Sequence, residues 1–316
     1  MVASQASQSS RKGRKHIKST AFPYLMTLPY FLIYALFGLF PIIYTFFLSF
    51  YDWNGVAAKA FVGLSNYVRL AGDPVFWTTL LNTLILAVFT LPLQLLLGFA
   101  LAAVLSGKAM PLKKTFRFFN FLPYITNSVA IGMIFSVLFT WRGGVVNQAL
   151  RLLGLISKDI YWTGKPWPAR IMVAIMLIWK NTGYTSLFFA AGITNINPSL
   201  YEAAELDGAN GFQRHVYITL PMLKNVIRFV VLTSSIGLLQ LFDELYNLFS
   251  GTATNAQVLV GGPRNAALTT VWYMYDKGFG SVVELGYASA IAYGLFIVIL
   301  VLTVIINKAL EGRRSI

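Results

Sequence analysis

The sequence predicts an all-α integral membrane protein, and three observations support this fold class. Of its 316 residues, 57% are hydrophobic and only 11% are charged, and the mean hydropathy is +0.65. Soluble domains carry roughly a quarter charged residues. Long runs without any Asp, Glu, Lys or Arg recur along the chain, and the Lys and Arg residues between them are unevenly distributed. A multi-pass membrane protein with helical spans therefore explains this composition best.

Six apolar segments are long enough to cross a bilayer, whose hydrocarbon core of about 30 Å needs roughly 20 residues of helix. Four of them hold long charge-free runs, at 19–51, 74–107, 118–141 and 285–307, whereas the fourth contains Lys180 and the fifth contains Asp243 and Glu244. We expect a six-span domain over residues 21–312, with spans at about 22–50, 76–106, 116–141, 170–194, 226–249 and 284–307. Proline kinks a helix or marks its start, as we expect at Pro29, Pro41, Pro92 and Pro123.

The distribution of basic residues predicts the orientation, because Lys and Arg are retained on the cytoplasmic side. With the N-terminus inside, fifteen Lys and Arg residues fall on the cytoplasmic side and eight outside. Both termini and the segment 195–225 are therefore expected in the cytoplasm. Residues 1–20 are expected to be a disordered basic tail, and the first span an uncleaved anchor. The net charge of +14 indicates lipid headgroups, and not nucleic acid, as the partner.

Several kinds of chemistry are disfavoured by the residues that the chain lacks. With no Cys and two His, the sequence offers neither a disulfide framework nor a thiolate or histidine metal cluster. A phosphate-binding loop needs Gly-Lys followed by Ser or Thr, but Gly107-Lys108 and Gly164-Lys165 are followed by Ala109 and Pro166. No nucleophile–base pair is apparent either. We therefore expect a protein that is not an enzyme and carries no cofactor.

The segment 195–225 has its own helix signals. Ser199 and Glu202 have the spacing of a capping box just after Pro198, so a short helix is expected from there to about Gly208. A second helix should run from Phe212 toward Leu220, with Pro221 bending the chain into the fifth span. An ordinary surface helix between two spans would show the same capping signal.

The pattern of residues 202–221 resembles the EAA loop of the permease subunits of bacterial ABC importers. Further motifs resemble the carbohydrate-uptake branch of these permeases, with a maltose-permease-like partner as the best match: Leu28-Pro29-Tyr30, Pro41, Phe61–Tyr67, Asp73–Trp77, Asn82-Thr83 and Gly261-Gly262-Pro263. The resemblance implies a type I ABC importer permease with six transmembrane helices and a cytoplasmic EAA coupling loop. Its coupling residues would be Glu202, Ala203, Ala204, Asp207, Gly208, Ala209, Ile218, Leu220 and Pro221.

The same resemblance implies a set of partners in a bacterial cell membrane. They are a second homologous permease, two ATP-binding subunits that hold ATP and Mg, and an extracytoplasmic solute-binding protein. The function implied is transport of a di- or oligosaccharide by alternating access. A free-standing channel, a secondary transporter or an ABC permease for a non-sugar solute are the alternatives.

Candidate sugar-binding residues are polar side chains inside three spans, repeated at helical spacing. They are Tyr124, Asn127 and Ser128, then Lys180, Asn181 and Tyr184, and then Gln240, Asp243, Glu244 and Asn247. An ionisable residue within a span costs about 2.5–3.5 kcal/mol, so it normally faces a cavity or a partner. Lys180, Asp243 and Glu244 depart from the maltose-type pattern, which argues against maltose itself. Alternatively, Lys180 pairs with Asp243 or Glu244 as a structural bridge.

Overall fold

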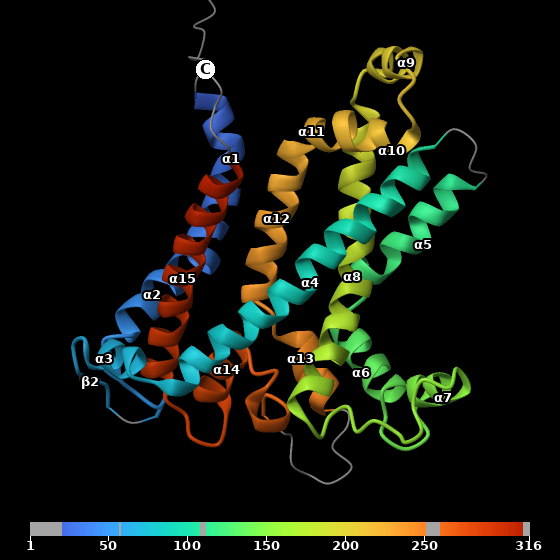
Figure 1. The fold of residues 1–316 in the computed structure, drawn as a ribbon. Helices are drawn as coiled ribbons and strands as arrows, with labels where there is room; N and C mark the ends of the chain where they lie inside the picture. Colours follow the sequence, from blue (N-terminus) through green and yellow to red (C-terminus); the bar gives the residue numbers. More distant parts are fainter. Residues whose placement is uncertain (1–20, 57, 108–111, 251–259, 312–316) are drawn as a thin grey trace, which may run out of the picture. The chain divides into compact units, whose positions relative to one another are not determined.

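The computed structural model describes residues 21–56, 58–107, 112–250 and 260–311, which form helices joined by short connections (Figure 1). The predicted tail 1–20 lies outside the described residues. The chain divides into two compact units, residues 1–47 and 48–316.

The described part of the first unit, from residue 21 onward, is a helical run without a charged residue, built from α1 (Ala21–Tyr34), the π-helix η1 (Ala35–Leu39) and α2 (Phe40–Leu48). Proline lacks an N–H, and its ring clashes with the carbonyl four residues earlier. The π-turn precedes Pro41 by two residues and accommodates it without ending the helix. Pro29 likewise lies inside α1.

The second unit begins with a short antiparallel pair of strands in which Tyr51 lies opposite Phe61. Its elements in chain order are β1 (Tyr51–Asp52), β2 (Ala60–Phe61), α3 (Ser65–Ala71), α4 (Pro74–Ser106), α5 (Lys113–Ile125), α6 (Ser128–Leu138), α7 (Val145–Leu152), α8 (Pro166–Thr194), α9 (Pro198–Leu206), α10 (Gly211–Arg214), η2 (His215–Thr219), α11 (Leu220–Met222), α12 (Lys224–Leu239), α13 (Asp243–Ser250), η3 (Pro263–Asn265), α14 (Thr270–Phe279) and α15 (Leu285–Glu311).

Three helices of the described chain are long and apolar enough to cross a membrane, namely Phe22–Leu48, α4 and α15. The number rises to five if each of two bent helix pairs forms one span. The predicted fourth span coincides with the 29-residue helix α8. Pro92 lies within α4 and does not end it.

Two predicted spans are not single helices. The third is broken into α5 and α6, which meet at 94°. Pro123 lies in the last turn of α5, and Asn127 begins α6 by accepting a hydrogen bond from the Val129 N–H at 2.8 Å. The fifth ends at Leu239 and resumes at Asp243, after a three-residue linker. A further bend of 69° separates Gly211–Met222 from α12, just after Pro221. An apolar run does not reveal such breaks, because hydropathy is the same for a straight and a bent helix.

Glycines allow the helices around these breaks to touch backbone to backbone. A Cβ atom added at Gly183 of α8 would lie 1.8 Å from the carbonyl oxygen of Asn120 in α5. One added at Gly132 of α6 would lie 2.7 Å from the carbonyl oxygen of Glu244 in α13. The first glycine permits the packing of α5 against α8, and the second brings the starts of α6 and α13 together.

Asp73 connects three helices of the second unit. It caps α4 and accepts hydrogen bonds from the hydroxyls of Tyr273 in α14 and Tyr287 in α15. Burial opposes ionisation of Asp73, but these hydrogen bonds and that of the Val75 N–H outweigh it, so the pKa of Asp73 is lowered. Burial and the Asp73 carboxylate raise the pKa of Tyr273. Because Asp73 is ionised at neutral pH, it links α4 to α14 and α15 under ordinary conditions.

Candidate functional site

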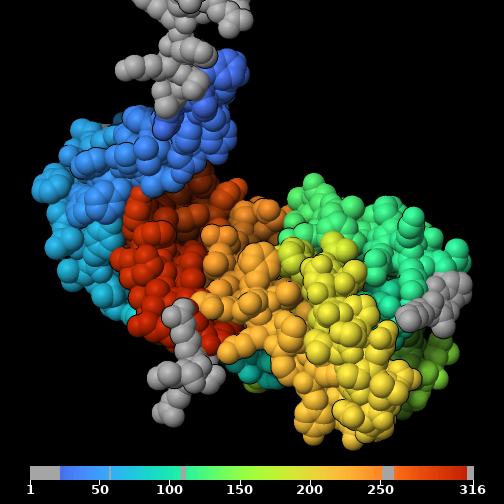
Figure 2. All heavy atoms as spheres, turned by 90° about the horizontal axis from the view of Figure 1, so that it is seen from above, coloured from blue at the N-terminus to red at the C-terminus, as the bar shows by residue number. Residues whose placement is uncertain are grey.

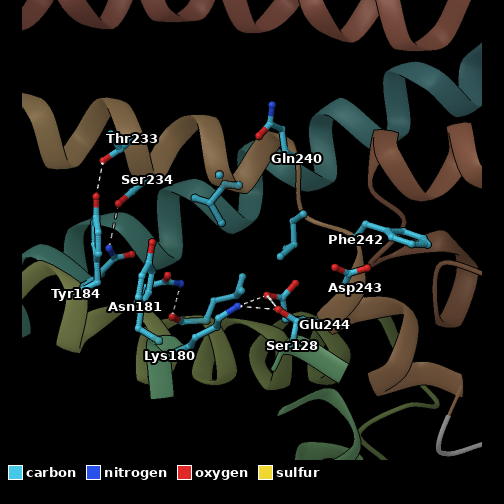
Figure 3. A pocket seen from close by; sticks show the side chains of 16 residues that line it. Ser128, Lys180, Asn181, Tyr184, Thr233, Ser234, Gln240, Phe242, Asp243 and Glu244 are labelled. Carbon is cyan, nitrogen blue, oxygen red and sulfur yellow. Dashed lines mark hydrogen bonds and ion pairs between the residues drawn. The ribbon is translucent and has the colours of Figure 1, made fainter. Parts of the chain in front are cut away.

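A polar cavity of about 330 Å³ lies where the broken helices meet α8. Figure 3 shows its sixteen lining residues. Eight of the ten predicted binding residues line it: Tyr124, Ser128, Lys180, Asn181, Tyr184, Gln240, Asp243 and Glu244. The linker between α12 and α13 contributes Gln240 to Phe242 directly, so the break in the fifth span builds part of the wall.

An ion pair occupies one side of the cavity. The Lys180 ammonium donates to the Glu244 carboxylate and, at 3.1 Å, to the Ser128 hydroxyl, which itself donates to Glu244 at 2.9 Å (Figure 3). The Lys180 and Glu244 side chains are only 12% and 9% exposed. Glu244 lies in the first turn of α13, where the helix dipole favours a negative charge. Of the two partners predicted for Lys180, Glu244 is therefore the one that it contacts.

An aromatic pair forms a second part of the wall. The rings of Tyr124 and Tyr184 are stacked, with centroids 4.5 Å apart and planes inclined by 24°. The Tyr184 hydroxyl points to the Thr233 hydroxyl at 3.4 Å. Flat aromatic faces next to hydroxyl and amide groups suit a ligand that combines apolar faces with many hydroxyls.

Gln94 of α4 also lines the cavity and was not predicted. Its amide donates to the hydroxyls of Thr185 at 2.8 Å and Ser234 at 3.1 Å, so it ties α4 to α8 and α12. Gln94 and Asn82 are the two amides of the charge-free run 74–107, but neither belongs to a cluster of amide and ionisable side chains at helical spacing that would predict a polar face there. Thr233, Ser234 and Phe242 line the cavity as well. The two hydroxyl residues lie in the predicted fifth span, about two turns before its amide and carboxylate residues, and Phe242 carries no polar group.

Two predicted residues lie outside the cavity lining. Asn127 caps α6 through its hydrogen bond with the Val129 N–H. Asn247 donates to the backbone carbonyl of Asp243 at 2.7 Å, one helical turn earlier. Each amide instead forms a hydrogen bond with the backbone near a helix start. Their role in binding stays a prediction.

The segment 195–225, which we term the coupling segment after the role that the resemblance predicts for it, forms a helical hairpin at one end of the second unit (Figure 1). Its residues appear in yellow and orange at the surface in Figure 2. Glu202, Ala203 and Ala204 lie in α9. Gly208 ends this helix with a φ of +80°, and the Ala209 N–H returns to the Ala204 carbonyl at 2.8 Å. The predicted helix stop at Gly208 therefore matches the structure.

The predicted capping box at Ser199 is wrong. Asn197 is the N-cap of α9 and accepts a hydrogen bond from the Ser199 N–H at 3.1 Å. A capping box does occur in this segment, between Asn210 and Gln213 at the start of α10. Because Pro198 is favoured at the first helical position, it places the cap one residue before itself.

The second half of the segment runs through a π-turn. Asp207 follows the last residue of α9, Ile218 lies in η2, and Leu220 and Pro221 lie in α11. Three large apolar side chains of the segment are strongly exposed: Leu206 at 90%, Phe212 at 77% and Tyr217 at 75%. Such exposure beside short capped helices is typical of a surface that binds another protein.

Comparisons with known proteins identify the family. The model of the binding-protein-dependent transport system inner membrane component family matches residues 94–316. The chain belongs to this family. It is 37% identical to the lactose transport system permease protein LacF of Rhizobium radiobacter, over 92% of this chain and 94% of that protein. It is 35% identical to the arabinooligosaccharides transport system permease protein AraP of Bacillus subtilis, over 97% of this chain and 94% of that protein.

Solved structures agree with this assignment. A bacterial ABC transporter involved in the import of the acidic polysaccharide alginate matches with a TM-score of 0.76 and 25% identity, covering 95% of this chain and 98% of that chain. The same kind of transporter has been crystallised with an alginate pentasaccharide-bound periplasmic protein. The predicted resemblance to permeases of carbohydrate-uptake ABC importers is therefore confirmed, and the chain is a multi-pass transport permease subunit.

Proposed function

We propose that this permease subunit forms, together with a second homologous permease, the membrane pathway for a di- or oligosaccharide. The observation that carries the proposal is the cavity that the stacked Tyr124 and Tyr184 line together with the amide side chains of Asn181 and Gln240. Rings pack on the apolar faces of a sugar, while hydroxyl and amide groups exchange hydrogen bonds with its hydroxyls. Relatives named for lactose, arabinooligosaccharide and trehalose/maltose transport support the same class of substrate.

The proposal also includes a membrane topology and a source of energy for transport. The chain spans the bacterial cell membrane six times, with α5–α6 and α12–α13 as broken spans and both termini in the cytoplasm. The coupling segment then lies on the side where ATP is available, and its exposed Leu206 and Phe212 bind an ATPase subunit. Two such subunits hold ATP and Mg, and their closure tilts the permeases so that the cavity opens to an extracytoplasmic binding protein.

The test is uptake in a host strain that lacks the chromosomal copy of this permease. Wild-type protein should restore uptake of a labelled neutral disaccharide or oligosaccharide, and purification from the same cells should recover a second membrane protein and an ATPase. Tyr184→Ala should reduce uptake about tenfold, because the packing of a half-buried aromatic ring contributes up to about 1.5 kcal/mol. Tyr161→Ala is the matched control, since Tyr161 stacks on Trp141 away from the cavity.

Two outcomes would refute the proposal. Restoration of uptake for an ion or an amino acid but for no saccharide would place the substrate in another class. Full transport by the purified chain alone, without a second permease or an ATPase, would identify a self-sufficient carrier instead.

A further inference from the structure

The charges on the cavity wall do not cancel. Among the sixteen lining residues, Lys180, Asp243 and Glu244 are the charged ones, so one cation faces two carboxylates. The distribution of this surplus negative charge follows from the contacts that each group makes.

Lys180 is already neutralised by the protein. Its ammonium contacts Glu244 and Ser128, and the Lys180 side chain is only 12% exposed. A cation in contact with a carboxylate acts on a third group as a dipole, so its attraction for an anionic ligand is largely cancelled. An approaching carboxylate would also have to compete with Glu244 for the ammonium, at the cost of leaving a buried charge unpaired.

Asp243 is in the opposite situation. It is the neighbour of Glu244 at the start of α13, yet it is exposed and takes no part in the ion pair (Figure 3). None of the ion pairs of the described residues includes Asp243, and no dashed line joins its carboxylate to another residue in Figure 3. Its nearest labelled neighbours in the wall are Phe242 and Glu244, and neither supplies a positive charge.

We propose that this wall selects saccharides without negative charge, with Asp243 as the specificity-determining residue and Glu244 as the group that masks Lys180. The inference rests on the proposed saccharide transport and names its substrate class. A neutral sugar hydroxyl or the ammonium group of an amino sugar donates to Asp243, whereas a uronate meets an unpaired carboxylate. This preference is the opposite of the one that the alginate importer would suggest for a similar chain, since alginate is an acidic polysaccharide.

The experiment measures direct binding, so that the solute-binding protein cannot impose its own selection. The transporter is purified with its partner subunits in lipid nanodiscs, without the binding protein. Calorimetric titration then compares β-1,4-linked disaccharides of glucose, glucosamine and glucuronate, at a pH where the amino sugar is cationic and the uronate anionic. The affinity ratios between probes are the readout.

In the wild-type transporter the glucosamine disaccharide should bind about tenfold more tightly than the glucose disaccharide, and the glucuronate disaccharide about tenfold less tightly. Asp243→Asn should bring both ratios close to one. Glu244→Gln should unmask Lys180 and raise the ratio of uronate to neutral affinity about tenfold. Asp276→Asn of α14 is the control, because it removes the same charge at a position that does not line the cavity.

Equal or tighter binding of the uronate by the wild type would overturn the inference, as would ratios that Asp243→Asn leaves unchanged. If Glu244→Gln fails to fold, the Asp243→Asn ratios still decide. When the neutral disaccharide binds and charge has no effect, only this inference fails. When the intact complex binds none of the three, the proposed saccharide function fails with it.

Discussion

The cavity and the coupling segment each contain a Glu paired with a basic residue, but the two pairs lie in opposite environments. In the cavity, the Lys180 and Glu244 side chains are 12% and 9% exposed, and Ser128 satisfies both. In the coupling segment, Arg214 lies 3.1 Å from Glu205 with side chains that are 30% and 70% exposed. Buried charges demand a fixed geometry, whereas exposed ones tolerate its loss. The Lys180–Glu244 pair therefore helps to hold the cavity wall in place, whereas the Arg214–Glu205 pair contributes little to the structure of the coupling segment.

The apolar side chains show the reverse pattern. Around the cavity they are packed: Leu245 and Leu248 of α13 are fully buried. In the coupling segment Leu206 and Phe212 are among the most exposed apolar residues of the described chain. The cavity wall is thus packed by side chains of this chain, whereas the coupling segment leaves large apolar side chains uncovered.

Removal of the Glu from each ion pair should give the largest difference in stability between the two regions. Glu244→Ala leaves the Lys180 ammonium buried without its partner and should lower the free energy of unfolding by about 3–5 kcal/mol. Glu205→Ala, the matched change in the coupling segment, should cost less than about 1 kcal/mol because its pair is solvated. Denaturation of both variants in mixed micelles provides the comparison. Equal losses would mean that burial does not distinguish the two pairs.

A smaller effect is expected at the helix stop of the coupling segment. Gly208 has a φ of +80°, which a β-branched residue adopts only with strain, so Gly208→Val should cost about 1–2 kcal/mol. The strain should also displace the end of α9 and abolish uptake. Gly211→Val is the control, since a Cβ there meets nothing within 4 Å and its φ is not positive. Asn tolerates the left-handed region, so Gly208→Asn should retain more stability and uptake than Gly208→Val; the reverse order would contradict the assigned cause.

The two regions were also predictable from the sequence to different degrees. The cavity residues were found because ionisable and amide groups are conspicuous in an apolar run, as Lys180 and Gln240 illustrate. The 94° break after Ile125 was not foreseen, because Pro123 and Asn127 signal a kink without its angle. The N-cap of α9 is Asn197 and not the predicted Ser199. Both residues carry a capping signal in the sequence, and the backbone conformation decides which of them caps the helix. Local propensity located the elements, whereas tertiary packing decided which polar groups meet.

A substitution at Leu206 should have the smallest effect on stability, yet it should distinguish the functions of the cavity and the coupling segment most clearly. Leu206→Ser removes a side chain that is 90% exposed, so the free energy of unfolding should change by no more than about 0.5 kcal/mol. If the segment is the docking surface of an ATPase, the same change should weaken ATPase copurification and reduce uptake, while saccharide binding in the cavity persists. Leu152→Ser of α7 is the matched control, because Leu152 is 89% exposed and lies in a different connection. Loss of ATPase association in Leu206→Ser alone would assign the exposed apolar surface to the partner. Unchanged association in both variants would mean that the coupling segment is an ordinary surface hairpin. The cavity and the segment would then not differ in their need for a partner protein.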